Sequence, residues 1–427
     1  MKILFVVFNY YPSIGGTQIL FQKVAEKLAN DYDDDVSVFT TNSFYGPDKP
    51  IFKKIIPSFE VINKVKVYRF SFTRIHKKIF RFINKVLMRC FKKRNLFITE
   101  KLVGPWSSSL KRAIYKSDAE VIIASSASFL YMLYPLTRLK QKNPKPFIFQ
   151  GAIHFNYDSK HSSVSQKVLN AIKRSDVYWA NTKYEKQRLI ALGVNPEKIK
   201  TVGISIDVEK FSRGDSGYCR KFLNVKDDEL LIAYLGRIEI FKSIDLLLQA
   251  ARLVYDKFKK IKIVIAGTAS AYSNELKQII ANFPADLKNK IHFLENICED
   301  EKINFCNAMD MLILPSVNES FGMVFLEAWA CKKPVIGAKI GAVASVITED
   351  TDGLLFMPGD SADLAKQILK LAQNNYMRTA MGENGFNKVM NNYTVKIVAE
   401  KCRQTCFEAI EIFENKFPDK IALKIRC

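Results

Sequence analysis

The sequence lacks the long apolar runs, paired cysteines and histidine clusters that identify several classes of protein. No window reaches the roughly eighteen uninterrupted apolar residues that a membrane-spanning helix needs. The eight cysteines are scattered without a Cys-x-x-Cys pair, and the chain has four histidines, so we expect no structural zinc site. Free thiols in this arrangement are typical of the reducing cytoplasm, which is the expected compartment.

Two short motifs are also missing. No Gly-x-Gly-x-x-Gly follows the first apolar run, which argues against a nicotinamide-dependent oxidoreductase. No Asp-x-Asp stands in a position suited to a metal ion, because the acidic run 31–35 precedes an expected strand and is interpreted as a solvated turn. The apolar run 2–8 has one positive charge and no small-residue cleavage site, which a signal peptide would need. We therefore interpret it as a buried strand.

Positive charge is abundant but unevenly distributed. The 427 residues carry a net charge of +22. Residues 1–200 hold 35 Lys and Arg against 14 Asp and Glu, whereas residues 201–427 hold 30 against 29. The first half is therefore suited to an anionic partner, and the length suggests two or three domains.

Short apolar runs alternate with amphipathic helical stretches along most of the chain, as in parallel sheets covered by helices. Two successive series of such runs predict an α/β protein with two doubly wound domains. The polar stretch 209–228 is the best candidate for a linker between them. The expected strands are 2–8, 36–40, 65–70, 121–124, 147–150 and 177–180 in the first series, and 230–235, 261–266, 291–294, 311–315, 334–337 and 354–357 in the second.

Two loops at the expected carboxyl ends of strands carry residues suited to phosphate. Gly15 and Gly16 lie between the first strand and a helix, where paired glycines let the backbone approach a ligand, although a plain tight turn is an equally good interpretation. Arg237 and Lys242 follow the strand 230–235. Their joint position favours a diphosphate site over two unrelated solvated charges.

The sequence ESFGMVFLEAWA contains two glutamates eight positions apart. Glu319 precedes an expected helix, and Glu327 lies about 8 Å further along its axis. The free amides of Phe321, Gly322 and Met323 at the helix start suit a phosphate or a hydroxyl group. The simpler alternatives are an interaction of Glu319 with the helix dipole and a buried ion pair for Glu327.

Five motifs, which follow one another along the chain in the family's order, resemble those of the retaining glycosyltransferases of family 4 (glycosyl transferases group 1), which have the GT-B architecture. Glu319 and Glu327 match an E-x7-E motif. The run 236–247 resembles G-R-x4-K-G-x-D-x-L with Ser243 in place of glycine, and 352–360 resembles G-L-L-V-x-P-G-D. The segment 202–211 resembles an interdomain P-N-G-V-D motif with three departures. The paired glycines near position 15 match an N-terminal glycine loop.

The resemblance implies two Rossmann-like domains that face each other across a cleft. It divides the chain into an acceptor-side domain over 1–205, a nucleotide-sugar-binding domain over 206–394, and a C-terminal helix over 395–427 that returns to the first domain. It implies a retaining hexosyltransferase that moves a sugar from a nucleoside-diphosphate sugar to a glycan or lipid-linked acceptor, with no metal and no cofactor. Capsule, lipopolysaccharide or another cell-surface polysaccharide is the expected product.

The resemblance also implies roles for the candidate residues. Glu327 binds the ribose of the nucleotide, and His154, which follows the strand 147–150, lies near the donor sugar unless it is merely structural. The expected catalytic residues are Glu319 and His154. The expected diphosphate site consists of Arg237, Lys242, Gly15 and Gly16, and the donor-sugar site of Glu319, Phe321, Gly322 and Met323.

The most basic stretch, residues 74–94, has helical spacing with apolar residues on one side and basic residues on the other. Lys77, Lys78, Arg81 and Lys85 lie on the basic side. Such helices lie on anionic bilayers, so we expect a peripheral protein on the cytoplasmic face of the inner membrane. A helix whose apolar side lies in the domain core is an equally good interpretation.

Two other functions fit parts of the sequence. A sugar-nucleotide epimerase shares the fold and the donor site but uses no acceptor. A nucleic-acid-binding protein would use the basic charge, but no recognised nucleic-acid motif or pattern of stacking aromatic residues is present, so we expect no nucleic-acid partner.

Overall fold

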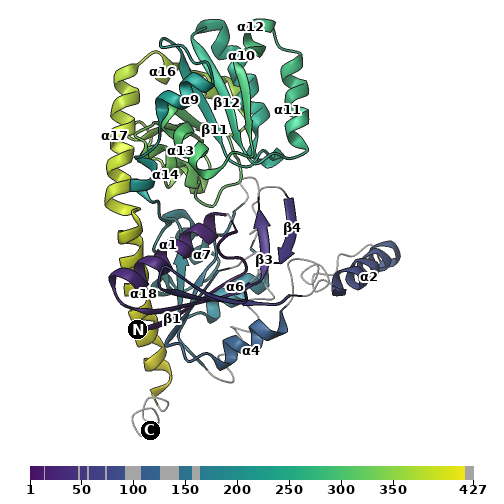
Figure 1. Cartoon of the computed structure of the whole chain (residues 1–427), viewed down its shortest axis with the longest axis vertical. Coiled ribbons are helices and arrows are strands. Elements are labelled where there is room, and N and C mark those ends of the chain that lie inside the picture. The colour runs from purple at the N-terminus through teal and green to yellow at the C-terminus, as the bar shows by residue number, and fades with distance from the viewer. Residues whose placement is uncertain are drawn as a thin grey trace.

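A computed structural model describes residues 1–13, 15–46, 49–54, 57–72, 75–91, 107–125, 144–155 and 164–418 of the protein. The side chains of residues 45, 46, 49–54, 75–78, 90 and 91 lie outside this description. Two α/β domains are stacked along the long axis of the molecule (Figure 1).

The first domain is built on one predominantly parallel sheet with the strand order β10-β9-β8-β7-β1-β2-β6-β5. Only the edge pair β5–β6 of this sheet is antiparallel. The five residues of β7 are all buried, because helices cover both faces of the sheet. The strands are β1 Lys2–Val7, β2 Asp35–Thr41, β5 Phe59–Ile62, β6 Val65–Phe70, β7 Val121–Ser125, β8 Phe147–Gln150, β9 Val177–Ala180 and β10 Ile199–Thr201.

Three helices of the first domain, α4, α6 and α7, begin at side-chain caps. Ser107, Ser165 and Thr182 each accept a hydrogen bond from a backbone N–H three residues ahead, which satisfies one free donor of the helix start. The sequence did not predict the hairpin of β3 Ser43–Gly46 and β4 Lys49–Lys54. The helices are α1 Gly16–Asp31, α2 Ile75–Phe91, α4 Ser108–Lys116, α6 Gln166–Arg174 and α7 Lys183–Ala191.

The second domain has a six-stranded parallel sheet with the order β13-β12-β11-β14-β15-β16. The chain reverses its direction of travel across the sheet between β11 and β14, and it does the same between β1 and β7 in the first sheet. Ligands of open α/β sheets bind at the carboxyl ends of the strands at such reversal points. The strands are β11 Leu230–Leu235, β12 Ile261–Gly267, β13 Ile291–Glu295, β14 Met311–Leu314, β15 Val335–Ala338 and β16 Gly353–Phe356.

Eight helices of four residues or more lie in the described part between β11 and residue 392. They are α10 Ile244–Lys257, α11 Tyr272–Ala281, α12 Ala285–Lys288, α13 Glu299–Ala308, α14 Met323–Ala330, α15 Gly341–Ala344, α16 Ser361–Ala372 and α17 Asn375–Asn392. The prediction of two doubly wound α/β domains is confirmed by the two sheets and their helical layers.

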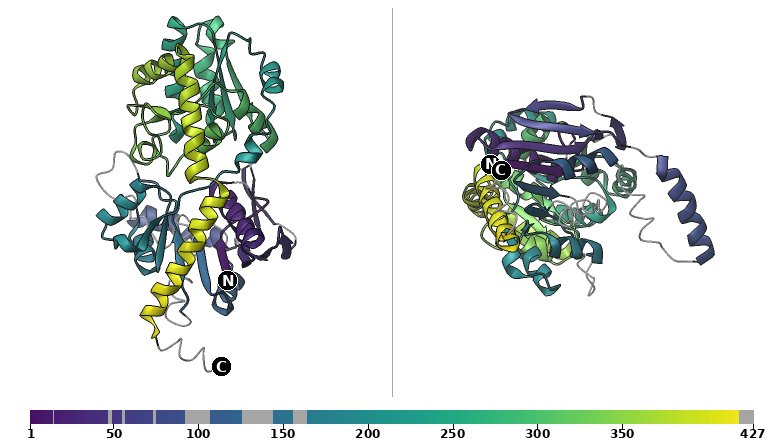
Figure 2. Two further views of the ribbon diagram at one scale, coloured as in Figure 1. Left: turned by 90° about the vertical axis from the view of Figure 1, so that its left-hand side faces the viewer. Right: turned by 90° about the horizontal axis from the view of Figure 1, so that it is seen from below.

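The chain passes between the domains twice, and the two passages are hydrogen bonded to each other. The N–H of Ile206 donates to the carbonyl of Tyr393 at 2.9 Å. After the second passage, helix α18, Val395–Lys416, runs along the first domain and contacts α1 (Figure 2). The expected linker 209–228 is not irregular, because it contains the helices α8 Val208–Phe211 and α9 Ser216–Phe222.

Helix α2 stands apart from the body of the first domain in Figures 1 and 2. Ile79, Phe82 and Val86 on its apolar side are 57%, 69% and 43% exposed. The interpretation that this side lies in the domain core is therefore wrong for these three residues. Residues 92–94 of the basic stretch and the side chains of Lys77 and Lys78 lie outside the described part. None of the described helices is long and apolar enough to span a bilayer.

The interpretation of the run 31–35 as a solvated turn is wrong for Asp34. Its side chain is only 1% exposed and accepts hydrogen bonds from the N-terminal ammonium group at 3.1 Å and from Arg403 Nε at 2.9 Å. One buried carboxylate thus ties the start of β1 and helix α18 together.

We expect Asp34→Ala to lower the free energy of unfolding by about 3 kcal/mol, because it leaves two cations without their buried partner. Thermal and urea unfolding of the full chain measure this loss. Asp118→Ala is the control, since Asp118 forms an ion pair with Lys2 but is 81% exposed, and it should have no measurable effect. Equal stability of the two variants would contradict the assignment.

Candidate functional site

A cleft of about 270 Å³ lies where the carboxyl edges of the two sheets meet. We call it the interdomain cleft. The first domain contributes Gly16, Thr17, Leu20, Gln150, Ala152, Asn181 and Ile204 to its wall, and the second contributes Leu235, Gly236, Arg237, Lys242, Leu314 and residues 319–324. The switch points of both sheets therefore open into one cavity.

The start of helix α14 forms part of the second-domain wall. Gly322 has a φ of 90°, and an added Cβ would lie 2.6 Å from the ring of Phe325, so only glycine fits without strain. The N–H groups of Phe321, Gly322 and Met323 lie at the helix start, where the preceding turn offers no helical carbonyl. These three predicted sugar-site residues all line the cleft.

Lys242 and Glu319 form an ion pair in the cleft, with side chains only 12% and 10% exposed. Arg237 is 53% exposed, donates to Glu239 at 3.1 Å, and lies over the ring of Phe241. Arg237 and Lys242 therefore stand together at the carboxyl end of β11, and Glu319 joins them from the loop after β14.

Ser243, at the position where the resembled motif has glycine, adopts a left-handed conformation with a φ of 52°. This conformation is unfavourable for a residue with a side chain and favours glycine. Position 243 thus has a backbone conformation that glycine adopts readily, although the residue here is serine.

Glu327 lies deeper in α14 and does not line the cleft. It accepts a hydrogen bond from Lys302 Nζ at 2.9 Å, and Lys302 also pairs with Glu299 at 3.0 Å. Burial alone would lower the pKa of Lys302, but the two glutamates outweigh it and raise that pKa above its usual range. The structure thus shows Glu327 in a buried ion pair, and contact with a ribose stays a prediction.

Gly16 lies opposite Met323, where the start of α1 approaches the start of α14. A Cβ added to Gly16 would lie 2.6 Å from the sulfur of Met323, so a larger residue would have to displace the Met323 side chain. Gly15 precedes it as the N-cap of α1 and does not line the cleft.

His154 is on the first-domain side, in the loop after β8, and is exposed to solvent. Desolvation by the neighbouring protein lowers its pKa, and the charge of Lys242 acts in the same direction. The carboxylate of Glu319 and hydrogen bonding with Asn318 oppose this change. His154 therefore faces the second-domain residues Asn318, Glu319 and Lys242 across the cleft.

A buried carboxylate that the sequence analysis missed holds the His154 loop. Glu185 accepts hydrogen bonds from Tyr178 Oη at 2.6 Å, from the N–H of Asn181 at 2.6 Å and from the N–H of Ile153 at 3.3 Å. Burial raises the pKa of Glu185, and these hydrogen bonds act against that rise. The spacing of Thr182 and Glu185 is that of a capping box, which is the signal that identifies this position in the sequence.

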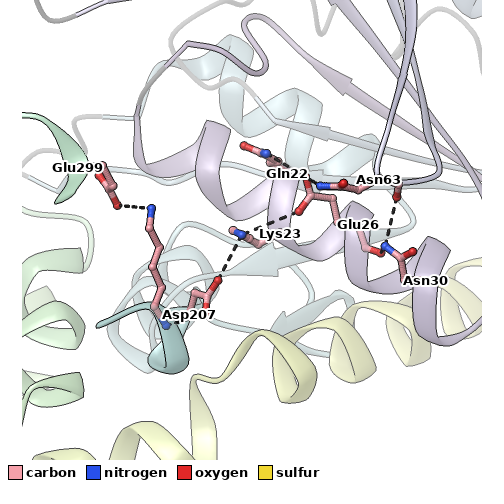
Figure 3. Close-up of polar contacts among 8 residues, drawn as sticks. Gln22, Lys23, Glu26, Asn30, Asn63, Asp207 and Glu299 are labelled. Atoms are coloured by element: carbon pink, nitrogen blue, oxygen red, sulfur yellow. Dashed lines mark hydrogen bonds and ion pairs between the residues drawn. The ribbon is translucent and has the colours of Figure 1, made fainter. Parts of the chain in front are cut away.

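Ion pairs connect helix α1 to the second domain (Figure 3). Lys23 of α1 pairs with Asp207 at 3.2 Å. Asp207 is the N-cap of the short helix α8, where its side chain accepts from the N–H of Lys210. The side chain of Lys210 pairs in turn with Glu299 at 3.2 Å. Glu299 in turn contacts Lys302, the partner of Glu327. A chain of alternating charges therefore runs from the first domain to α14.

Among the described residues, no group of three or more His, Cys, Asp or Glu side chains is close enough to hold a metal ion. The charged groups of the cleft are the two cations and the carboxylate already described.

Residues 219–388 match the glycosyl transferases group 1 family. These residues lie in the second domain, which is therefore similar to that family. This match confirms the resemblance that the motifs indicated.

The chain is also similar to a named relative. The D-inositol 3-phosphate glycosyltransferase of Kribbella flavida is 29% identical over 222 residues, which are 50% of this chain and 52% of the relative. The match thus spans about half the length of this relative.

Solved structures show the same fold over the whole chain. The crystal structure of Anabaena HepE in complex with UDP superposes with a TM-score of 0.69 at 19% identity, and covers 95% of this chain and 99% of that one. The apo form of the lipopolysaccharide outer core galactosyltransferase WaaB gives a TM-score of 0.62 at 14% identity, with 95% and 99% covered. The architecture is GT-B, as the sequence predicted.

We expect the pKa of His154 to depend on both partners across the cleft. Glu319→Gln should lower it further, because the carboxylate stabilises the imidazolium, and Lys242→Met should raise it. Titration of the histidine side chains by NMR measures both changes. An unchanged pKa in both variants would show that the two cleft walls are not this close in solution.

Proposed function

We propose that the protein is a glycosyltransferase that moves a hexose from a nucleoside-diphosphate sugar to a glycan or lipid-linked acceptor. The observation that carries this proposal is the joint position of Arg237, Lys242 and the start of α14 at the switch point of the second sheet. These groups face the first domain across a cleft of about 270 Å³.

The positive groups of the second domain suit the diphosphate of the donor. A guanidinium forms paired hydrogen bonds with phosphate oxygens, and free N–H groups at a helix start attract negative charge. When the bond between the sugar and the diphosphate breaks, negative charge grows on the leaving oxygen. Groups that are already oriented stabilise this charge without reorganisation, and in this proposal they take the place of a metal ion.

In the donor complex Lys242 turns from Glu319 to the diphosphate. Glu319 and the neighbouring amides then hold hydroxyl groups of the sugar, and His154, with its lowered pKa, is neutral and contacts the sugar from the first domain. The E-x7-E resemblance supports transfer with retained anomeric configuration. Glu327 binds the ribose after it separates from Lys302. The UDP complex of a structure with the same fold supports a nucleotide as part of the ligand.

The acceptor belongs to the first domain, which carries the basic excess. Helix α2 offers six basic or histidine side chains and no acidic ones, and its apolar side is exposed. This combination suits the surface of an anionic bilayer. We propose that the enzyme is peripheral to the cytoplasmic face of the inner membrane and builds a cell-surface polysaccharide, in line with the lipopolysaccharide substrate in the name of WaaB.

We expect Arg237→Ala to weaken donor binding at least tenfold, because one hydrogen bond to a charged group contributes about 1.5–3 kcal/mol. A panel of UDP-glucose, UDP-galactose, UDP-N-acetylglucosamine and GDP-mannose, tested by thermal shift and calorimetry, identifies the donor and measures its affinity. The control is Arg213→Ala, the same substitution at an exposed position outside the cleft, and it should bind the donor as the wild type does. Wild-type affinity in Arg237→Ala would contradict the diphosphate site. A product that is an epimerised nucleotide sugar would favour the epimerase instead.

We expect the protein to sediment with vesicles of phosphatidylglycerol and phosphatidylethanolamine at low salt. Replacement of Lys77, Lys78, Arg81 and Lys85 by glutamine should abolish sedimentation, since each basic residue near the surface contributes about 1 kcal/mol. A control with four exposed lysines of the second domain replaced by glutamine should bind as the wild type does. Equal binding of both variants would refute the role of α2. The control lysines are Lys221, Lys226, Lys257 and Lys288.

A further inference from the structure

Three polar side chains form a row at the carboxyl edge of the first-domain sheet, and two of them line the interdomain cleft. Ser125 ends β7, Gln150 ends β8 and Asn181 follows β9, and these three strands are neighbours in the parallel sheet. The carboxyl ends of parallel strands meet at one edge, so the side chains contact one another. All three are almost completely buried, with 4%, 1% and 4% of their surface exposed.

The hydrogen bonds along this row have a direction. Ser125 Oγ donates to Gln150 Oε1 at 2.5 Å, and Gln150 Nε2 donates to Asn181 Oδ1 at 3.0 Å. An amide that accepts through its oxygen keeps its N–H₂ group for other partners. Asn181 Nδ2 therefore remains as the free donor at the end of the row, and it has no acceptor among the described residues.

The position of Asn181 is fixed from its backbone as well. Its N–H donates to Glu185 Oε2 at 2.6 Å, and Glu185 is itself only 1% exposed. Gln150 and Asn181 both line the interdomain cleft, on the wall opposite Arg237 and Lys242, whereas Ser125 does not line it. Asn181 lines the cleft with a side-chain donor that no described residue satisfies, so its N–H₂ group is available to a ligand there.

We propose that Asn181 Nδ2 donates a hydrogen bond to a carbohydrate hydroxyl oxygen in the cleft, and that Ser125 and Gln150 are positioning residues that orient the amide. This inference rests on the proposed function. A neutral amide suits a hydroxyl group, while the diphosphate is opposite the cations of the other wall. The hydroxyl belongs to the donor sugar or to the acceptor sugar, and both have the same chemistry.

The test uses two variants of the full chain. Asn181→Asp replaces the donor nitrogen by an oxygen of similar shape, and Ser125→Ala removes the group that orients Gln150 without changing the cleft wall. The probes are the nucleotide sugar from the panel that stabilises the wild type most and its nucleoside diphosphate. Calorimetry gives both affinities, and a transfer or hydrolysis assay gives kcat/KM.

We expect kcat/KM to fall about tenfold or more in Asn181→Asp and several-fold in Ser125→Ala, while the affinity for the nucleoside diphosphate is unchanged. A parallel loss of nucleotide-sugar affinity assigns the hydroxyl to the donor sugar, and a loss confined to transfer assigns it to the acceptor. A defect that is only structural would weaken nucleoside-diphosphate binding equally, and this result would overturn the inference.

The control is Asn374→Asp, the same chemical change at a helix cap outside the cleft, where the side-chain oxygen accepts from the N–H of Met377. It should behave as the wild type. If Asn181→Asp does not fold, Asn181→Ser and Ser125→Ala carry the test. Wild-type kcat/KM in these variants would refute the role of Asn181 alone, whereas a wild type that binds none of the nucleotide sugars would refute the proposed function.

Discussion

The carboxyl edges of two parallel sheets meet at one cleft, and this geometric constraint positions each group of the candidate site. A parallel sheet gathers the loops after its strands at one edge, and the switch point opens a crevice there. Gly16 follows β1, Asn181 follows β9, and Arg237 and Glu319 follow β11 and β14. Four loops from distant parts of the sequence thus line one cavity, with neutral amides on one wall and cations on the other.

Electrostatic contacts link this cavity to the connection between the domains. The two passages of the chain are hydrogen bonded through Ile206 and Tyr393, and the ring of Tyr393 packs edge-on against Phe321 at 5.5 Å. The ion pairs from Lys23 to Glu299 lie beside this connection (Figure 3). Phe321 thus lines the cleft and also contacts the connection between the domains.

The sequence predicted the parts of the fold that depend on local patterns. Buried strands such as β7 and β11 are continuous apolar runs, and the alternation of such runs with amphipathic helical stretches predicted both sheets. The hairpin β3–β4 and the edge strand β10 lack such a pattern. The burial of Asp34 depends on Arg403, which lies 369 residues away in the chain, and no local signal reveals such a contact. The row from Ser125 to Asn181 is likewise formed by three strand ends that only the sheet order brings together.

Motifs identified the residues of the second-domain wall, because Arg237, Lys242 and Glu319 each belong to a short sequence motif. They did not reveal the ion pair of Lys242 with Glu319 or that of Lys302 with Glu327, because the partners in each pair come from different motifs or elements of the chain. In the proposed function both cleft walls bind one ligand. Hydrogen exchange of the full chain with and without its nucleotide sugar tests it most directly. If both walls bind the ligand, protection should increase in residues 16–20 and 319–324 together. Protection confined to the second domain would contradict a ligand shared by the two walls.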